Sequence, residues 1–227
     1  MEHSFTWFSL LFPESLGHVV TAIFVVLLLG ALSLRAKKAL EQSSSLIPDS
    51  GPSLANIFEV AMEAVVGLIQ SIIGHHAEKY LPLIGTLFLF IFTCNILGII
   101  PGFLPPTDNI NTNAACALTV FAMYNYYGFR EHGIKYLKQF TGPIFWLAPL
   151  MFFIEIFSHL FRPFSLSVRL FGNIFGDHLV LSIFSDLVPL IVPIAFMILG
   201  IAVSLIQAFV FSLLSSVYIA LAVSHDH

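Results

Sequence analysis

Long apolar segments alternate with short polar ones along the whole chain. A helix needs about 20 predominantly apolar residues to cross the hydrocarbon core of a bilayer. Several segments approach or exceed that length, so we expect membrane-embedded helices there. These segments cover residues 18–34, 81–100, 114–127, 144–160, 164–187 and 193–223. The third segment is short, and we expect it to borrow residues from its flanks.

Residues 54–73 follow a different pattern. Their apolar side chains recur every three or four positions, while Glu59, Glu63 and Gln70 fall largely off that stripe. This spacing is typical of an amphipathic helix, and Ser53 is expected to be its N-cap. A helix with one apolar and one polar face can lie in the membrane interface, and we expect this helix to do so.

The two C-terminal segments are longer than one membrane crossing requires. A helix over residues 193–223 would measure roughly 45 Å, against a hydrocarbon layer of roughly 30 Å. Such a helix must tilt strongly. Pro163 is expected to separate the segment 164–187 from the one before it, because proline lacks the N–H that continues a helix. The pattern predicts one polytopic all-α membrane domain over residues 1–227. It has about five membrane-embedded helices and one interfacial amphipathic helix, and its last two helices are long and strongly tilted.

Composition argues against the water-soluble classes. The chain has 227 residues, of which 58% are hydrophobic and 10% charged, whereas soluble domains are about 25% charged. Cys94 and Cys116 lie in apolar segments without CxxC spacing and are expected to be small core residues. His75 and His76 have no third ligand nearby, so we expect solvated side chains there and not a metal site. The lipid bilayer is the partner that composition implies; no cofactor, metal or nucleic acid is expected.

The nine Lys and Arg residues are unevenly distributed. Three follow the segment 18–34, Lys79 precedes the second segment, and three lie in residues 128–143. The first 17 residues have none, and they lack the cleavage site of a signal peptide. Because loops rich in Lys and Arg stay in the cytoplasm, we expect a periplasmic N-terminus and cytoplasmic basic loops. This arrangement suits a multi-pass protein of a bacterial inner membrane.

One permanent cation, Arg169, lies inside an apolar segment. Placing an arginine in hydrocarbon costs at least about 2.5 kcal/mol, so water, a counter-charge or a partner must compensate it. In a helical projection Asn173 and two glycines share its face. Two explanations remain open: a structural ion pair with Asp177 or Glu155, or a functional site inside the membrane.

Other polar residues in the apolar segments also have two explanations. His178 is either a hydrogen-bonded core histidine or part of a polar site, and Gln207 either bonds a neighbouring helix or lines such a site. Glu155 and His159 lie one helical turn apart. Arg162 is close to a predicted helix end, so its side chain is expected to extend to the lipid headgroups.

The string Ser167-Val-Arg-Leu-Phe-Gly-Asn173 resembles the signature of subunit a of the rotary ATP synthases of bacteria. Gln207-Ala-Phe in the last segment and Glu155, fourteen residues before Arg169, fit the same family. Supporting matches cover most of the chain. The two strings at this separation are far more specific than either string alone.

The resemblance implies the proton-translocating stator subunit of the membrane sector of ATP synthase. In that family two offset aqueous half-channels reach the middle of the membrane from opposite sides, and Arg169 would face the carboxylate of a rotating ring of c subunits. Peripheral-stalk b subunits are the other implied partners. Asn173 and Gln207 would line the inlet channel, and Glu155 would lie beside the cytoplasmic one. H⁺ is the implied ion; Na⁺ stays open, because the carboxylate site of the ring decides between them.

The family often has an acid–histidine pair at the positions of His178 and Gly200. Here the pair is broken, because glycine has no side chain. We expect the adjacent Asp177 to supply the missing acid. Histidine titrates near neutral pH, which suits a proton relay.

The chain is expected to do no ATP chemistry itself, because it lacks a phosphate-binding GxxxxGK[ST] loop. The alternative function is a secondary ion-coupled transporter with a charged site at the membrane midplane. That class tends to contain internal repeats, and none is evident here. An intramembrane hydrolase would need a metal motif or a nucleophile–base pair, and neither is evident in the sequence.

Overall fold

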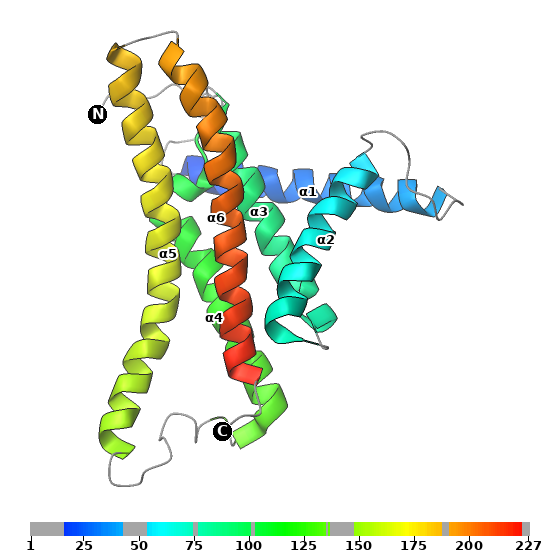
Figure 1. Cartoon of the computed structure of the whole chain (residues 1–227), viewed down its shortest axis with the longest axis vertical. Coiled ribbons are helices and arrows are strands. Elements are labelled where there is room, and N and C mark those ends of the chain that lie inside the picture. The colour runs from blue at the N-terminus through cyan, green and yellow to red at the C-terminus, as the bar shows by residue number, and fades with distance from the viewer. Residues whose placement is uncertain are drawn as a thin grey trace.

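The computed structural model describes residues 16–42, 54–74, 77–100, 103–134, 136, 148–187 and 191–223. Every regular element in these ranges is a helix (Figure 1). The long helices are α1 (Gly17–Gln42), α2 (Leu54–Ile73), α3 (Leu81–Ile99), α4 (Ile110–His132), α5 (Ala148–Leu187) and α6 (Ile191–Val223). Two short 3₁₀ helices, η3 (Ala77–Lys79) and η4 (Pro106–Asp108), precede α3 and α4. The predicted all-α class is confirmed.

Three helices of the described part are long and apolar enough to cross a membrane. They cover Gly17–Lys38, Leu81–Ile99 and Ile194–Val223. With α4 and α5, which carry more polar residues, the total agrees with about five membrane-embedded helices. Cys94 and Cys116 are free and buried, as expected of small core residues.

α5 corrects the prediction of a helix boundary at Pro163. The helix runs without a break over 40 residues, with Pro163 inside it. Proline removes one backbone hydrogen bond. The buried side chains of Leu166 and Leu170 hold the helix after Pro163, and the hydrogen bond between His159 and Asn125 of α4 holds it before Pro163. Residues 144–147 of the predicted fourth segment lie outside the described residues. At 1.5 Å per residue, α5 is about 60 Å long, so it cannot stand upright in a bilayer.

α4 and α1 are also longer than predicted. α4 begins at Ile110 because the side chain of Asn109 accepts a hydrogen bond of 2.9 Å from the backbone N–H of Asn111. It ends at Gly133, whose φ of +57° suits a residue without a side chain. α1 continues past residue 34 to Gln42. The basic residues predicted for the following loop therefore lie in its last turns.

α2 has the predicted bounds, and its amphipathic pattern decides its packing. The stripe residues Val65, Leu68 and Ile69 are buried in a core shared with α3, α4 and α6. Glu63 and Gln70 are exposed. Its position at the membrane interface stays a prediction, and the expected N-cap, Ser53, lies outside the described residues.

α5 and α6 lie side by side along the long axis of the molecule, and α1, which packs on α2, α3 and α4, runs at a steep angle to them (Figure 1). The strong tilt of α5 and α6 in the bilayer stays a prediction. The core lies between α2, α3, α4 and α6, and α5 contributes Leu166 and Leu170. α5 is thus an outer helix with one long side uncovered by the described part of the chain.

Candidate functional site

Arg169 projects from the uncovered side of α5. Its neighbours on that side, Ser165, Gly172 and Asn173, are exposed as well. A Cβ atom built on Gly172 or Gly176 would meet no heavy atom of another element within 4 Å. Space for a partner therefore exists beside the guanidinium.

No counter-charge for Arg169 is found among the described residues. The carboxylate of Glu155 pairs with Arg162, at an Oε1–Nη2 distance of 3.9 Å, and Asp177 lines a cavity. The predicted alternative of a structural ion pair with either acid is therefore not supported. Other side chains of the same helix, such as those of Phe161 and Val168, are apolar and exposed.

Gln207 joins α6 to the backbone of α5 at Arg169. Its side chain is buried, and Nε2 donates a hydrogen bond to the Arg169 carbonyl oxygen at 3.4 Å. Oε1 of Gln207 accepts a hydrogen bond from Nδ2 of Asn173. Three residues predicted for one site, Arg169, Asn173 and Gln207, thus lie together. We name this arrangement the Gln207 junction.

A cavity of about 60 Å³ lies on the other side of α5, between α3, α5 and α6. It brings together Asp177, His178 and Gly200, the three positions of the predicted relay. A cavity needs about 10–15 Å³ for each water and several polar partners, so this one has room for a short chain of waters. A Cβ atom on Gly200 would meet only the side chain of Ile99, at an ordinary 3.5 Å. The missing side chain at position 200 therefore adds to the open volume.

Asn95 is a residue of this cavity to which the sequence assigned no role. Its side chain is 2% exposed, and Oδ1 accepts a hydrogen bond of 2.9 Å from the hydroxyl of Thr107. Nδ2 is buried without a hydrogen-bond partner in the described part of the chain. A buried amide donor that lines a polar cavity is well suited to bind water. The sequence feature that could have indicated this role is a single asparagine within the apolar sequence of α3.

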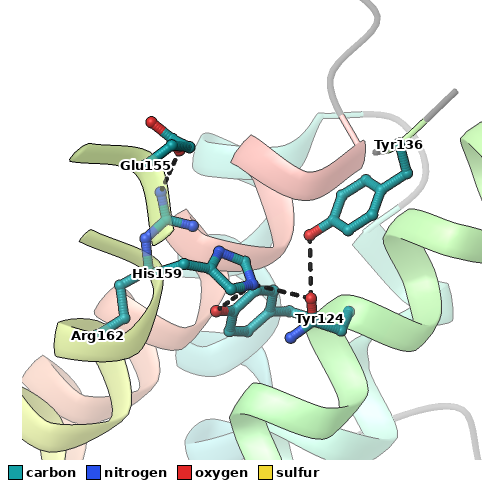
Figure 2. A network of polar contacts seen from close by, with 6 residues as sticks. Tyr124, Tyr136, Glu155, His159 and Arg162 are labelled. Atoms are coloured by element: carbon teal, nitrogen blue, oxygen red, sulfur yellow. Dashed lines mark hydrogen bonds and ion pairs between the residues drawn. The ribbon is translucent and has the colours of Figure 1, made fainter. Parts of the chain in front are cut away.

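Arg162 corrects a second prediction, because its side chain turns into the protein and does not extend to the headgroups (Figure 2). The guanidinium carbon lies 6.0 Å from the ring centre of Tyr124 on α4 and 5.4 Å from that of Tyr218 on α6. The faces of aromatic rings attract cations, and Glu155 supplies the opposite charge. Arg162 therefore contacts α4 and α6 at once.

His159 lies beside this cation and is hydrogen-bonded to side chains of α4 (Figure 2). Its Nε2 is 2.9 Å from Oδ1 of Asn125 and 3.1 Å from the hydroxyl of Tyr124. The hydroxyl of Tyr136, in the segment after α4, donates to the same Asn125 oxygen at 3.3 Å. Burial raises the pKa of Tyr136, and the nearby Arg162 acts in the opposite direction. Tyr136 therefore keeps its proton at neutral pH and stays a donor.

Comparison with known proteins identifies relatives over nearly the full length. The sequence profile of the family described as ATP synthase A chain matches residues 18–220. The chain is 47% identical to ATP synthase subunit a of Trichlorobacter lovleyi over 213 residues, which cover 94% of this chain and 90% of the relative. It is 44% identical to ATP synthase subunit a of Bdellovibrio bacteriovorus over 228 residues, covering 99% and 100%. For ATP synthase subunit a of Geobacter sulfurreducens the identity is 47%, with 91% and 87% covered. The chain therefore belongs to the ATP synthase A chain family.

Proposed function

We propose that this chain is the proton-conducting, stationary subunit of the membrane sector of a bacterial ATP synthase. Its relatives are named ATP synthase subunit a, and they align with nearly the whole chain. The observation that supports the mechanism is Arg169, an exposed cation on the uncovered side of α5 without a counter-charge in the described residues. Family membership decides against the alternative of a secondary transporter.

Arg169 acts through its permanent charge. A guanidinium beside a ring carboxylate favours the ionised carboxylate, so each carboxylate gives up its proton as it reaches Arg169. Arginine cannot release its own proton, so no proton crosses directly between the two half-channels. Lysine would serve less well, because a buried lysine readily loses its proton.

Protons reach the ring through the cavity between α3, α5 and α6. Asp177 and His178 supply the titratable groups, with Asp177 in place of the acid that position 200 lacks. Asn95 binds water in the same cavity through its unpartnered amide donor. Asn173 and Gln207 continue the polar path toward Arg169, and their mutual hydrogen bond supports this order.

Protons leave through the other half-channel, beside Glu155. Glu155 lies fourteen residues before Arg169 on α5, toward the basic connection between α4 and α5. The positive-inside rule puts that connection in the cytoplasm. The ion pair of Lys79 with Glu131, at 3.5 Å, supports one basic side for the start of α3 and the end of α4.

The partners follow from the uncovered surfaces. The ring of c subunits packs against the exposed side of α5 and α6, and b subunits of the peripheral stalk bind elsewhere on the bundle. The chain resides in the bacterial cell membrane with its N-terminus in the periplasm. It binds no nucleotide and contributes only the ion path, while ATP is made in another part of the complex.

ATP-driven acidification of inverted membrane vesicles tests the function. Arg169→Ala should abolish acidification while the complex assembles, as judged by a blot against its other subunits. Ser165→Ala, one turn away on the same exposed side, is the matched control and should acidify normally. Normal acidification by Arg169→Ala would mean that the guanidinium has only a structural role, and it would overturn the proposal.

A further inference from the structure

The rotation of α5 about its own axis decides where Arg169 points. Successive side chains of a helix point in directions about 100° apart. If the packing of α5 shifted by one residue, the guanidinium of Arg169 would therefore point about 100° away from its present direction. Apolar packing is non-directional, whereas hydrogen bonds need defined angles and distances. Polar junctions between α5 and its neighbours are therefore the features that can fix its rotation.

The Gln207 junction is one of these features, and it holds α5 to α6 at Arg169 and Asn173. A second polar junction lies at His159, ten residues before Arg169, and it holds α5 to α4. Arg169 is thus bracketed by two junctions that face different helices. Together they resist rotation better than either does alone.

The hydrogen-bond network fixes the proton position at His159. Nδ2 of Asn125 donates to the carbonyl oxygen of Phe121 at 2.7 Å, so Oδ1 is the amide atom that faces the histidine. An amide oxygen only accepts hydrogen bonds. Nε2 of His159 therefore carries a hydrogen and donates it to Asn125, with the Tyr124 hydroxyl as its second neighbour at 3.1 Å.

Aromatic rings enclose the same histidine and continue the junction to α6. The ring of Phe121 packs against the imidazole edge to face, with the ring centres 5.2 Å apart. Tyr124 approaches it similarly at 5.1 Å. Tyr124 and Tyr218 of α6 both lie under the guanidinium of Arg162, one turn further along α5. Three helices therefore meet at this place.

We propose that His159, through Asn125 and Tyr124, is a positioning residue that sets the rotation of α5 and keeps Arg169 directed at the c-ring. The proposal rests on the proposed function, because it assigns His159 a role in aiming the residue that faces the ring. His159 is about 15 Å from Arg169 along the helix, so its effect on Arg169 acts through the helix.

The test uses the intact ATP synthase in inverted vesicles, with acidification normalised to the amount of assembled complex. His159→Leu removes the donor and should lower acidification about fivefold, the factor that one net hydrogen bond of about 1 kcal/mol represents. Asn125→Leu should have a similar effect. Because both changes break the same bond, the double variant should be no worse than either single variant.

Conservative variants separate positioning from simple loss of folding. His159→Gln keeps an amide donor of similar reach and should restore most of the acidification. His159→Asn is too short to reach Asn125 and should not. If His159→Leu fails to assemble, this pair still decides, because equal activity of the Gln and Asn variants would overturn the proposal.

Passive proton leak is the second readout. A misdirected Arg169 should raise the leak of vesicles stripped of the catalytic sector, whereas a merely structural defect lowers both pumping and leak with the amount of complex. Normal pumping by His159→Leu would contradict the positioning role of His159. A double leucine variant whose loss of acidification equals the product of the two single losses would contradict it as well. Arg169→Ala in the same preparation keeps the two proposals apart, because normal pumping by that variant would instead refute the proposed function.

Discussion

At the scale of single residues, the polar side chains of the apolar helices divide into two groups by their surroundings. Glu155, His159 and Arg162 find partners inside the chain. Arg169 does not, within the described residues, and it points out of the protein. Since hydrocarbon cannot solvate a guanidinium, the side chain without a partner is the one that implies a neighbouring subunit.

Asp177 is predicted to be the acid of the inlet relay. Asp177→Asn should lower ATP-driven acidification by at least about tenfold, since positioned acid–base groups typically contribute 10²–10⁴ in rate. The substitution preserves size and hydrogen bonding, so assembly should not change. Acidification at the wild-type rate would show that His178 works without Asp177.

An acid introduced at position 200 is expected to restore acidification that Asp177→Asn removes. Only the side chain of Ile99 lies near a Cβ atom on Gly200, at 3.5 Å. An aspartate at this position would point into the cavity that already holds His178. The double variant Asp177→Asn, Gly200→Asp should therefore recover part of the lost acidification, measured in the same vesicles. Gly200→Ala in the Asp177→Asn background fills the space without an acid and should recover none.

Residues whose surroundings are formed by distant parts of the chain were the ones that the sequence did not predict. The strings around Arg169 and Gln207 predicted which residues form the junction, because their chemistry is unusual in a membrane helix. The direction of Arg162 was predicted wrongly, since it depends on Tyr124 and Tyr218, far away in sequence. Asn95 received no role for the same reason, because its cavity is formed by three separate helices.

At the scale of helices, patterns that repeat were more informative than single residues. The three-four spacing of α2 predicted both of its ends. The rule that proline ends a helix failed for α5, where the packing of Leu166 and Leu170 after Pro163 and the hydrogen bond of His159 before it outweigh one missing hydrogen bond. The polar start of α4 was assigned to a loop, because its cap at Asn109 depends on a local hydrogen bond that hydropathy does not reveal.

The packing of α2 gives a test at this scale. Ile69 is fully buried in the core shared with α3 and α6, so Ile69→Ala should destabilise the protein by about 2–5 kcal/mol. Val60, on the same helix, is 67% exposed, and Val60→Ala should leave stability nearly unchanged. Thermal unfolding of the purified protein in detergent compares them. Equal midpoints would mean that the stripe of α2 does not pack against the bundle.

At the scale of the whole molecule, α1 runs at a steep angle to the paired helices α5 and α6 (Figure 1). If these two helices are inclined in the membrane as predicted, they present a broad side to the proposed ring of c subunits. Glu155 and Asp177 are about 33 Å apart along α5. The two proposed ends of the ion path therefore lie on opposite sides of Arg169.

The orientation in the membrane is a prediction of the same scale. After Cys94 and Cys116 are replaced by alanine, single cysteines are introduced at two exposed positions, Asn111→Cys and Arg130→Cys. A membrane-impermeant maleimide should label the first only from the periplasm and the second only from the cytoplasm. Labelling from the opposite sides would invert the topology and exchange the inlet and the exit.

The charge of Arg169 is proposed to keep protons from crossing the membrane except on the ring. Passive proton conductance, measured under a potassium diffusion potential in vesicles stripped of the catalytic sector, tests this role of the charge. Arg169→Ala should conduct protons faster than wild type in this assay and should fail to pump when the catalytic sector is present. A variant that assembles and neither leaks faster nor loses pumping would contradict the account.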